Sequence, residues 1–541
     1  MQVGDFSSCV RFNMPTISRT NQLLLEPSRK QLYDERQLSS ILNYAVKLQG
    51  KTFEDILVEN GLSEADIIYL RAQSMSNKGL LGNLIEQAYF GFPSNSRQEA
   101  DFAEIGVELK STPYEVTNNE IRPGETLSLT QINYRIPQEP DFYKSHVWEK
   151  LQKILIVYYQ REKRKAEQIK SKLFYSIGYV FMLKPDEQDK AIIEADYKLL
   201  VGYMFRGEAH FLSRTHGEYL GVAPKSSRRE YIEQYYEYQG KHVLALKRGF
   251  VLKTAYLTHI LKRASGITDD PGETIITNIS ALKEMSFAAL LENKVRPYIG
   301  MDKQLIWEMT KRPNEKSLSS AKNSEAILTC RMLGVQHNRV AEFIKAGIIP
   351  KVVSFTKEKG KNQQFRLDDI NFMELFNEEP DFPDDESYDD NERHGWEASK
   401  LFSSLADRQY LLMVFWETDK GTIFKGCQLW GISDSDLETV HQAWSKTKRI
   451  LSEGVDLVPH KDKSGKTYVK NNLPGISDNG VFHIRPHATK SYHVINGVPY
   501  GSGSIKDSDL LPNGNRITKQ AYWLNRQFIE SQLRPDLVMQ Y

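Results

Sequence analysis

The chain has 541 residues, of which 40% are hydrophobic and 26% are charged, so it is long enough for several domains with buried cores. Its 71 lysines and arginines nearly cancel its 70 aspartates and glutamates, which excludes a strongly basic or acidic protein and leaves a nucleic-acid partner undecided. Cys9, Cys330 and Cys427 lie far apart without a CxxC pair, which speaks against a disulfide framework or a thiolate zinc site and favours a reducing compartment.

The N-terminal segment MQVGDFSSCVRF lacks the basic start and apolar core of a signal peptide. Nowhere does the sequence contain a run of about 18 apolar residues that could span a bilayer. We therefore expect a cytoplasmic protein without a membrane partner.

We expect residues 1–34 to form a loose leader and residues 35–266 to form a first unit. Its beginning is helical, because LSSILNYAVKLQGKTFEDILVENGL and GLLGNLIEQAYFGF place apolar residues at spacings of three and four. Strand patterns follow in VELKST, TLSLTQINY and IGYVFMLK, and SHVWEKLQKILIVYY changes from helix to strand. RGFVLKTAYLTHIL supplies a last strand and helix, so the unit is of the mixed α/β (α+β) class.

The turn-rich segment TDDPGET at 268–274 marks a boundary, and we expect a helical connector over 267–310 and a second unit over 311–541. Landmarks of the first unit recur there in the same order. AYFGF before ADFAEIGVELK is echoed by RMLGV before AEFIKAGIIPK, SHVWEKLQKILIVYY by SKLFSSLADRQYLLMVFW, YLGVAPKSS by FHIRPHATK, and RGFVLKTAYLTHIL by QAYWLNRQFIESQL. Four pairs of similar segments that occur in the same order, separated by long intervening stretches, predict a duplicated fold.

The segment QEADFAEIGVELKSTPY concentrates charged residues of complementary type. In an extended strand Glu108 and Lys110 project to one side, because alternate side chains share a face. Asp101 arrives through a turn and could meet Glu108 at Mg²⁺, which favours a few oxygen ligands and keeps several waters. Lys110 could position or deprotonate an attacking water, and Glu86 on the preceding helix would add a carboxylate near the metal.

A solvated strand is the competing interpretation of this cluster. Glu-x-Lys is common in so charged a chain: Glu292-Asn293-Lys294 is another example, in a helical stretch. The triad alone does not separate a nuclease centre from a polar surface, since short motifs have many chance matches.

The wider context resembles a known family. KGLLGNLIEQAYFG, DFAEIGVELKSTP, SHVWEKLQKIL, HGEYLGVAPK and RGFVLKTAYLTHIL resemble successive blocks of MutH, the GATC-specific mismatch-repair endonuclease, over about residues 35–265. With its double length, and with FHIRPH and TKQAYWLN near the end, the chain also resembles the GATC-cutting type II restriction endonucleases of the Sau type. The resemblance implies a restriction-endonuclease-like core, duplicated as two MutH-like domains, and Mg²⁺-dependent cleavage of duplex DNA at GATC, 5′ of the G.

The resemblance also assigns roles to residues of the first unit. It makes Asp101 and Glu108 the metal-binding acids, Lys110 the catalytic lysine and Glu86 the helix glutamate of the catalytic set. It suggests DNA contacts at three further positions, which are Lys78, Lys150 and Glu125. For Lys78 and Lys150 a solvated helix face is an equal alternative, and His216 and Tyr219 of HGEYL are given no chemical role.

The base-reading position departs from the family pattern. MutH has an arginine just before the proline of the HGEYL block, and arginine is the commonest bidentate contact with guanine. Here Ala223 stands at that position, followed by a proline and by Lys225, a candidate DNA contact. The second unit keeps Arg485 at the echoed position, and we expect Arg485 and His487 to contact DNA.

The triad of the second unit is broken. Glu342 and Lys351 stand where the first unit has its aspartate and lysine, but Ile349 replaces the strand glutamate and Thr329 replaces the helix glutamate. With two acids missing, this unit should not hold Mg²⁺ well. The sequence therefore predicts one cutting unit followed by one DNA-reading or regulatory unit.

Three functions compete. The leading one is a bacterial type II restriction endonuclease that cuts double-stranded DNA, dimerises or loops on it, and has a companion DNA methyltransferase. The second is a MutH-like repair nicking enzyme, and the third is a catalytically silent DNA-binding regulator. The acidic run at 378–390 is either a solvated loop or an autoinhibitory DNA mimic.

Overall fold

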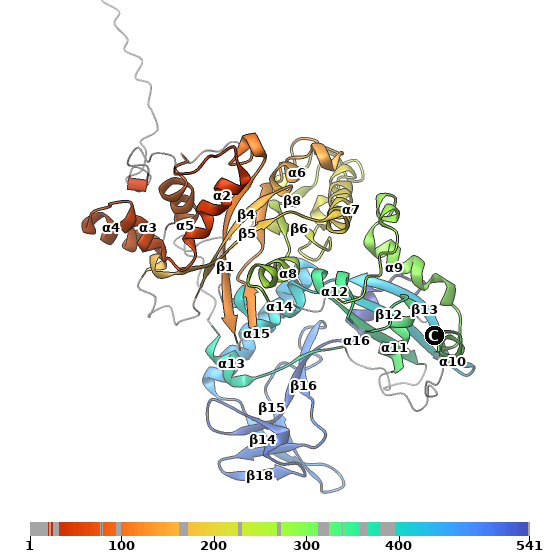
Figure 1. Cartoon of the computed structure of the whole chain (residues 1–541). Helices are drawn as coiled ribbons and strands as arrows, with labels where there is room; N and C mark the ends of the chain where they lie inside the picture. Colours follow the sequence, from red (N-terminus) through yellow and green to blue (C-terminus); the bar gives the residue numbers. More distant parts are fainter. Residues whose placement is uncertain are drawn as a thin grey trace, which may run out of the picture.

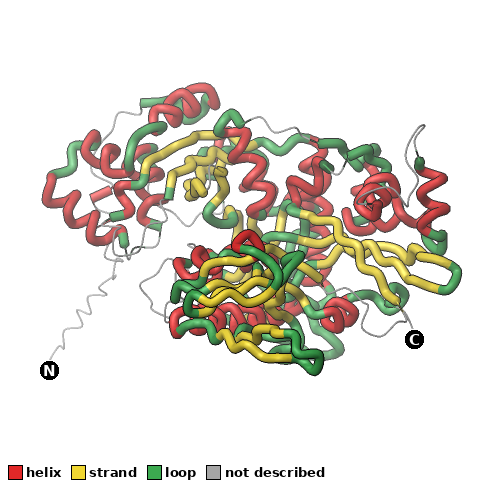
Figure 2. The backbone as a smooth tube through the Cα atoms, turned by 90° about the horizontal axis from the view of Figure 1, so that it is seen from below, coloured by secondary structure: helices red, strands yellow, loops and turns green. Residues whose placement is uncertain are grey.

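The computed structural model describes residues 20, 23–24, 32–75, 77, 79–92, 99–117, 120–161, 171–225, 230–267, 272–311, 324–337, 339–356, 365–378 and 395–538. Within these ranges helices and β-sheets are interspersed along the chain, which confirms the mixed α/β class (Figure 1; Figure 2). Cys9, Lys78, nearly all of the leader and nearly all of the acidic run 378–390 lie outside the described residues. Cys330 and Cys427 are buried free thiols. No described helix is both long enough and apolar enough to cross a membrane.

A four-stranded sheet in the order β2-β1-β4-β5 forms the centre of the first unit. In it β1 (Glu108–Thr117) runs parallel to β4 (Ile154–Gln160), while β5 (Ser176–Leu183) and β2 (Glu120–Pro123) are antiparallel to their neighbours. Strand β4 reads ILIVYYQ and is buried along nearly its whole length, because both faces of the sheet are covered. Alternate residues of β4 belong to two different apolar clusters, one on each face.

Short helices from the first 90 residues cover one of these faces (Figure 1). They are α2 (Leu38–Ala45), η1 (Val46–Leu48), α3 (Phe53–Glu59), α4 (Glu64–Ser74), α5 (Leu80–Asn83) and the π-helix η2 (Leu84–Tyr89). Helix α3 starts with a capping box, in which Thr52 accepts from the backbone N–H of Asp55 and Asp55 accepts from that of Thr52.

The other face packs on a second layer that contains a three-stranded antiparallel sheet in the order β3-β9-β6. Its strands are β3 (Leu127–Gln131), β9 (Arg248–Leu252) and β6 (Leu220–Pro224). Around it lie η4 (Phe142–Lys144), α6 (His146–Leu151), α7 (Glu187–Phe205), α8 (Thr254–Ala264) and the hairpin of β7 (Tyr231–Glu233) and β8 (Leu244–Leu246).

The second unit repeats this topology. Strand β10 (Ile348–Thr356) runs parallel to β12 (Gln409–Thr418), which pairs antiparallel with β13 (Gly421–Trp430), as β1, β4 and β5 do. A three-stranded antiparallel sheet again follows, in the order β11-β21-β16. Its strands are β11 (Phe365–Asp369), β21 (Gln520–Leu524) and β16 (Phe482–Pro486), and the matching helices are α14 (Lys400–Ala406), α15 (Asp434–Glu453) and α16 (Arg526–Gln532).

The repetition extends into the segment expected to be a connector. In the first unit the N–H of Gly50, just after η1, donates to the carbonyl of Ile177 on β5 at 2.8 Å. In the second unit the N–H of Gly300, just after η9 (Arg296–Tyr298), donates to the carbonyl of Phe424 on β13 at the same distance. Helices α9 (Phe287–Val295) and α10 (Lys303–Thr310) also pack on β13. We therefore place residues 287–310 with the second unit; the other domain boundaries and the duplication of the whole domain remain predictions.

The second unit adds a β-rich lobe that the described part of the first unit lacks, seen at the bottom of Figure 1. It contains the hairpin of β14 (Leu457–Lys461) and β15 (Thr467–Asn471) and a four-stranded sheet in the order β18-β17-β20-β19. The bounds of this sheet are β17 (Tyr492–Ile495), β18 (Val498–Gly501), β19 (Ser508–Leu510) and β20 (Arg516–Thr518). The remaining helices of the unit are α11 (Ser324–Met332), α12 (Ala341–Ala346) and α13 (Phe372–Asn377).

Partly buried polar contacts join the two units. The guanidinium of Arg248 on β9 donates to the carboxylate of Asp434 on α15 at 2.6 Å, and Lys345 on α12 donates to Asp189 on α7 at the same distance. One buried apolar cluster contains side chains from both units. The units therefore share a core as well as a covalent link.

Candidate active site

A tight turn brings Asp101 back alongside β1. The short helix η3 (Ala103–Ile105) ends at Gly106, whose φ of 62° is in the left-handed region that glycine tolerates. The backbone N–H of Phe102 then donates to the carbonyl of Val107 at 2.9 Å, which closes the turn. As a result the Oδ2 atom of Asp101 accepts from the N–H of Leu109 at 2.8 Å.

Glu108 lies between two lysines at the buried start of β1. Its side chain is 2% exposed, and its Oε1 atom accepts from the ammonium of Lys110 at 2.5 Å. Its Oε2 atom accepts from Lys150 at 2.9 Å, and Lys150 also donates to the backbone carbonyl of Glu99 at 2.6 Å. The structure thus places Glu108 and Lys110 on one face of the strand, and it brings Lys150 of α6 to the same carboxylate.

Glu86 lies in the π-helix η2 and faces the same charged group. Burial, and then the charge of Asp101, raise the pKa of Glu86 to about 7, although Lys110 acts in the opposite direction. Short π-helical segments are rare and occur frequently at functional sites. Helical periodicity alone does not reveal such a segment in the sequence.

The electrostatics of the group are those of crowded carboxylates. Burial, and then the charge of Glu108, raise the pKa of Asp101. Burial lowers the pKa of Lys110, but the charge of Glu108 and its hydrogen bond outweigh that effect and leave the pKa raised. Such repulsion between acids is relieved by a bound cation.

The donor set fits Mg²⁺ by chemical type. The described residues contain no group of three or more His, Cys, Asp or Glu side chains arranged to hold a metal ion. Mg²⁺, however, is usually bound through one or two carboxylates and retains several waters. Asp101 and Glu108 could supply those two carboxylates.

Lys225 approaches the site from the neighbouring sheet. Its ammonium donates to Ser128 Oγ on β3, and it reaches that atom by crossing β9 at Gly249, where an added Cβ would lie 2.2 Å from Lys225 Cε. Burial, and then the charge of Lys110, lower the pKa of Lys225, while Glu125 acts in the opposite direction. Lys225 and Glu125 therefore belong to the surroundings of the candidate site, and glycine inside a strand was the sequence signal for this close approach.

Three other positions singled out in the first unit have structural contacts. Ala223 pairs with Gly249 within the β6–β9 ladder and has no polar side chain to replace a guanine-reading arginine. Tyr219 is buried and stacks on Tyr256 with ring centroids 4.7 Å apart. Burial, and then Lys253, lower the pKa of His216 to about 4, and its Nδ1 atom accepts from the N–H of Ser213.

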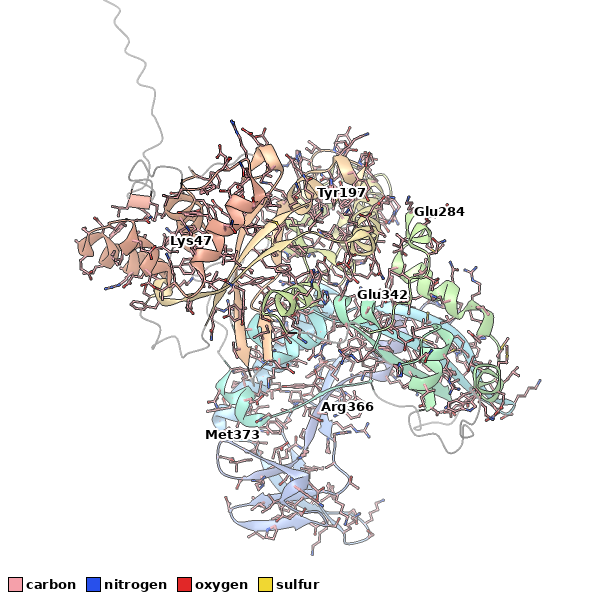
Figure 3. All side chains as sticks on the ribbon, viewed as in Figure 1. Lys47, Tyr197, Glu284, Glu342, Arg366 and Met373 are labelled. Carbon is pink, nitrogen blue, oxygen red and sulfur yellow. The ribbon has the colours of Figure 1, made fainter. Side chains whose placement is uncertain are left out.

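Glu342 of the second unit has a different task from Asp101. Its buried carboxylate accepts from the backbone N–H groups of Ile275 and Ile276, each at 3.2 Å, and from the side-chain amide of Gln188 at 2.8 Å. Figure 3 shows Glu342 at the junction of the two units. The carboxylate fixes a connecting segment against both units, so the structure does not place it at a cation site.

Arg485 and His487 lie on or just after β16, with both side chains exposed. The Arg485 guanidinium lies 5.4 Å from the centre of the Trp523 ring, and the ring of His487 lies 6.1 Å from it. These side chains therefore form a basic and aromatic surface on the β11-β21-β16 sheet.

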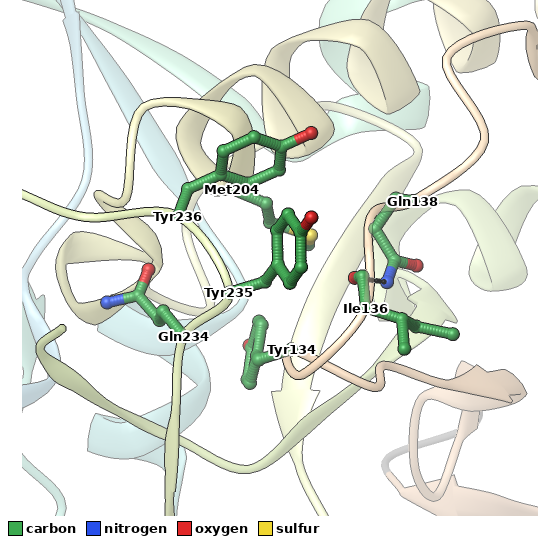
Figure 4. A pocket seen from close by; sticks show the side chains of 7 residues that line it. All are labelled: Tyr134, Ile136, Gln138, Met204, Gln234, Tyr235 and Tyr236. Carbon is green, nitrogen blue, oxygen red and sulfur yellow. Dashed lines mark hydrogen bonds between the residues drawn. The ribbon is translucent and has the colours of Figure 1, made fainter.

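A pocket elsewhere in the first unit offers no comparable chemistry (Figure 4). It is lined by uncharged side chains, namely Tyr134, Ile136, Gln138, Met204, Gln234, Tyr235 and Tyr236. The carboxylates and lysines that could hydrolyse a phosphodiester are at the start of β1 instead.

Comparison with known proteins agrees with this geometry. The family model of the DNA mismatch repair enzyme MutH matches residues 90–196. The type II restriction enzyme Sau3AI of Staphylococcus aureus is 28% identical over 484 residues, covering 84% of this chain and 92% of that protein. The DNA mismatch repair protein MutH of Vibrio cholerae serotype O1 is 28% identical over 225 residues, which is 41% of this chain and 94% of the relative.

The MutH match includes Asp101, Glu108, Lys110 and Lys150, whereas the alignment with Sau3AI extends well beyond the first unit. The resemblance expected from the sequence is thereby confirmed. The chain contains a MutH-type, restriction-endonuclease-like domain and is related over most of its length to a type II restriction enzyme of the Sau type.

Proposed function

We propose that the protein is a type II restriction endonuclease that uses Mg²⁺ to break both strands of unmodified duplex DNA at GATC, on the 5′ side of the G. Its relation to Sau3AI and MutH makes it a site-specific deoxyribonuclease. The observation that carries the proposal is the convergence of Glu86, Asp101, Glu108 and Lys110 at the start of β1.

Each residue of this group has a chemical task in the proposed reaction. Asp101 and Glu108 would hold the cation, and Lys150 fixes the carboxylate of Glu108 through its 2.9 Å hydrogen bond. When bound, Mg²⁺ supplies a Lewis acid that polarises the phosphate and promotes ionisation of the attacking water. Lys110 can donate to a phosphate oxygen and offset the charge that develops there. Glu86, with a pKa of about 7, can accept a proton near neutral pH.

The proposed specificity for GATC is what the resemblance to Sau-type enzymes and to MutH implies. Ala223 supports a changed reading of the bases in the first unit, because alanine cannot make a bidentate contact with guanine. We propose that Lys225 and Glu125, which lie beside the site, contact DNA there. Arg485 and His487 would contact DNA in the second unit.

Two alternative functions are less well supported. A repair nicking enzyme would resemble MutH, but the MutH relatives match only 41–42% of this chain, whereas Sau3AI matches 84%. A silent DNA-binding regulator would not require the complete set of acids and lysines in the first unit.

The proposal includes the setting of the enzyme. A restriction endonuclease requires a companion methyltransferase that protects the host DNA, and we propose that both act in the bacterial cytoplasm. Two chains would dimerise or loop on DNA, because a palindromic site presents the same chemistry on two strands.

Digestion of unmethylated plasmid with purified protein and Mg²⁺ tests the proposed function. We expect discrete fragments whose 5′ ends begin at the G of GATC, and no cutting of a matched plasmid without GATC or of any plasmid in EDTA. Nicked circles would favour the repair enzyme, and retarded but intact DNA would favour the regulator. Glu108→Gln should abolish Mg²⁺-dependent cutting.

A further inference from the structure

The second unit retains the strand lysine but has lost its acidic neighbours. Lys351 on β10 follows Gly347 by four residues, as Lys110 follows Gly106, and both glycines have positive φ, 68° and 62°. The positions of Glu108, Glu86 and Lys150 are taken by Ile349, Thr329 and Ser404. Ser404 is matched with Lys150 by its place in the helix: each is the fifth residue after the serine that caps the N-terminus of its helix, α6 or α14.

Each unit also has a cation in or next to its three-stranded antiparallel sheet. In the first unit it is Lys225, which ends at Ser128 on β3. On β3, Ser128 follows the residue that pairs with Leu252 of β9. On β11, Arg366 follows the residue that pairs with Leu524 of β21. The strand register therefore places Arg366 at the position of Ser128. Lys351 donates to the backbone carbonyl of Arg366 at 3.2 Å, so the two residues are neighbours.

Two arginines and one aspartate act on the pKa of Lys351. Burial, and then the charges of Arg366 and Arg408, lower the pKa of Lys351, and Asp368 opposes them. The carboxylate of Asp368 is already paired with the guanidinium of Arg408 at 3.0 Å and with the hydroxyl of Ser404. Lys351 forms no carboxylate ion pair with the described residues, whereas Lys110 pairs with Glu108.

A half-buried lysine beside an arginine is costly unless an anion offsets the charges. Arg366 pairs with Asp369 at 2.6 Å, but this pair is partly exposed, at 35% and 66%, so the guanidinium can exchange its partner at little cost. Arg366 is also the strand partner of Trp523, the ring beneath Arg485. Figure 3 shows Arg366 on the second unit, away from the junction with the first.

We propose that the second unit binds a backbone phosphate of duplex DNA through Lys351 and Arg366, at the place where the first unit has its cluster of acids. This inference rests on the proposed function, since it assumes that the second unit contacts DNA. It adds that this place has become an anion site, next to the Arg485 and Trp523 surface.

Lysine labelling of the whole protein tests the contact directly. Amines are acetylated briefly with and without a saturating duplex that contains one GATC, in Ca²⁺, and the modified peptides are measured by mass spectrometry. We expect the duplex to reduce acetylation of Lys351 severalfold. Lys420, exposed in the turn between β12 and β13, is the internal control and should be labelled equally in both samples.

Salt-dependent binding of variants provides the second measurement. Lys351→Met keeps the apolar stem beside Phe365 and removes the charge. It should lower the slope of log affinity against log salt by about 0.9, the value for one lost phosphate contact, on GATC and random duplexes alike. Lys351→Arg should restore the slope, and Lys420→Met should not change it. Melting curves of all variants would show that they are folded.

Each result separates this inference from the proposed function. Equal labelling of Lys351 with and without DNA, or an unchanged salt slope in Lys351→Met, would overturn the phosphate site even if the wild-type protein cuts plasmid. A wild-type protein that neither binds nor cuts DNA would overturn both proposals.

Discussion

Glu108 lies at the centre of the candidate site, where it accepts hydrogen bonds from two lysines. A carboxylate with a 2% exposed side chain is strongly disfavoured as an isolated charge, and two lysines, Lys110 and Lys150, make it tolerable. The same two cations also place the carboxylate in a fixed orientation. Removal of either lysine therefore affects both the charge and the geometry of the site.

Lys110→Ala should reduce the rate of DNA cleavage by orders of magnitude and leave DNA affinity largely intact. A group that stabilises the transition state more than the bound ground state contributes mainly to the rate. Single-turnover cleavage in Mg²⁺ and binding in Ca²⁺ measure the two quantities. The exposed Lys47→Ala is the matched control, and near-normal cleavage by Lys110→Ala would refute the assignment.

The buried carboxyl of Glu218 should make the free energy of unfolding depend on pH. This residue was not anticipated from the sequence, and burial, and then the charge of Asp196, raise the pKa of its carboxyl well above the usual value. Asp196 accepts three backbone N–H groups and is the better place for the negative charge, so the proton stays on Glu218 in the folded state.

In the unfolded chain Glu218 loses its proton above about pH 4.5. The folded state then binds the extra proton, so the free energy of unfolding falls as pH rises, by up to about 1.4 kcal/mol per pH unit. Glu218→Gln should flatten this dependence between pH 5 and 7, measured by denaturant unfolding. The exposed Glu233→Gln is the control; a wild-type slope in Glu218→Gln would show that the carboxyl is ionised in the fold.

At the level of elements, a lysine crosses a strand in the first unit because that strand carries a glycine. A Cβ at Gly249 would lie 2.2 Å from Lys225 Cε and 2.8 Å from the carbonyl of Thr130. In the second unit Ala521 has this position. The small residue on β9 therefore decides where the ammonium of Lys225 lies.

Gly249→Ala should displace Lys225 and lower cleavage while the protein remains folded. Lys225→Ala should lower it less, because the new Cβ at Gly249 would also press on the carbonyl of Thr130. The double variant should lose little more than Gly249→Ala alone, since that change already removes the Lys225 contact. Cleavage rates of the two single variants and the double variant complete the cycle. Additive losses would show that Gly249 acts through the sheet and not through Lys225.

Short-range patterns predicted more of the structure than long-range ones. The helix-to-strand segment SHVWEKLQKILIVYY is α6 and β4, and RGFVLKTAYLTHIL is β9 and α8, because apolar periodicity is local. The shared face of Glu108 and Lys110 was equally predictable, since they are two residues apart on one strand. The approach of Lys225 to Lys110 and the capture of residues 275–276 by Glu342 depend on tertiary packing, which periodicity does not contain.

For the whole molecule, the number of complete candidate sites would set the route to the proposed double-strand break. The described part of each chain brings together one full set of these acids and lysines, and the second unit has Ile349 where the strand glutamate would be. A single bound chain should therefore nick one strand and then release or turn before it cuts the other. Two chains that meet on DNA could cut both strands in one encounter.

Plasmids with two GATC sites should accordingly be cut faster than plasmids with one. We expect a monomer in free solution and a complex of two chains on DNA, measured by sedimentation with and without a short GATC duplex in Ca²⁺. The ion is chosen to permit binding with little cleavage. One chain per complex at saturating protein, together with equal rates on both plasmids, would rule out this arrangement.

The ion pairs between the units also have a consequence for synthesis of the chain. Asp189 pairs with Lys345, and Arg248 pairs with Asp434, so each partner in the first unit is made well over a hundred residues before its counterpart. At about 5–20 residues per second, the ribosome needs roughly ten seconds or more to supply the missing charge. During that interval the newly made first half exposes unpaired charges and an incomplete apolar face. A shortened chain that ends at residue 266 would remain in this state permanently, which makes it prone to aggregate.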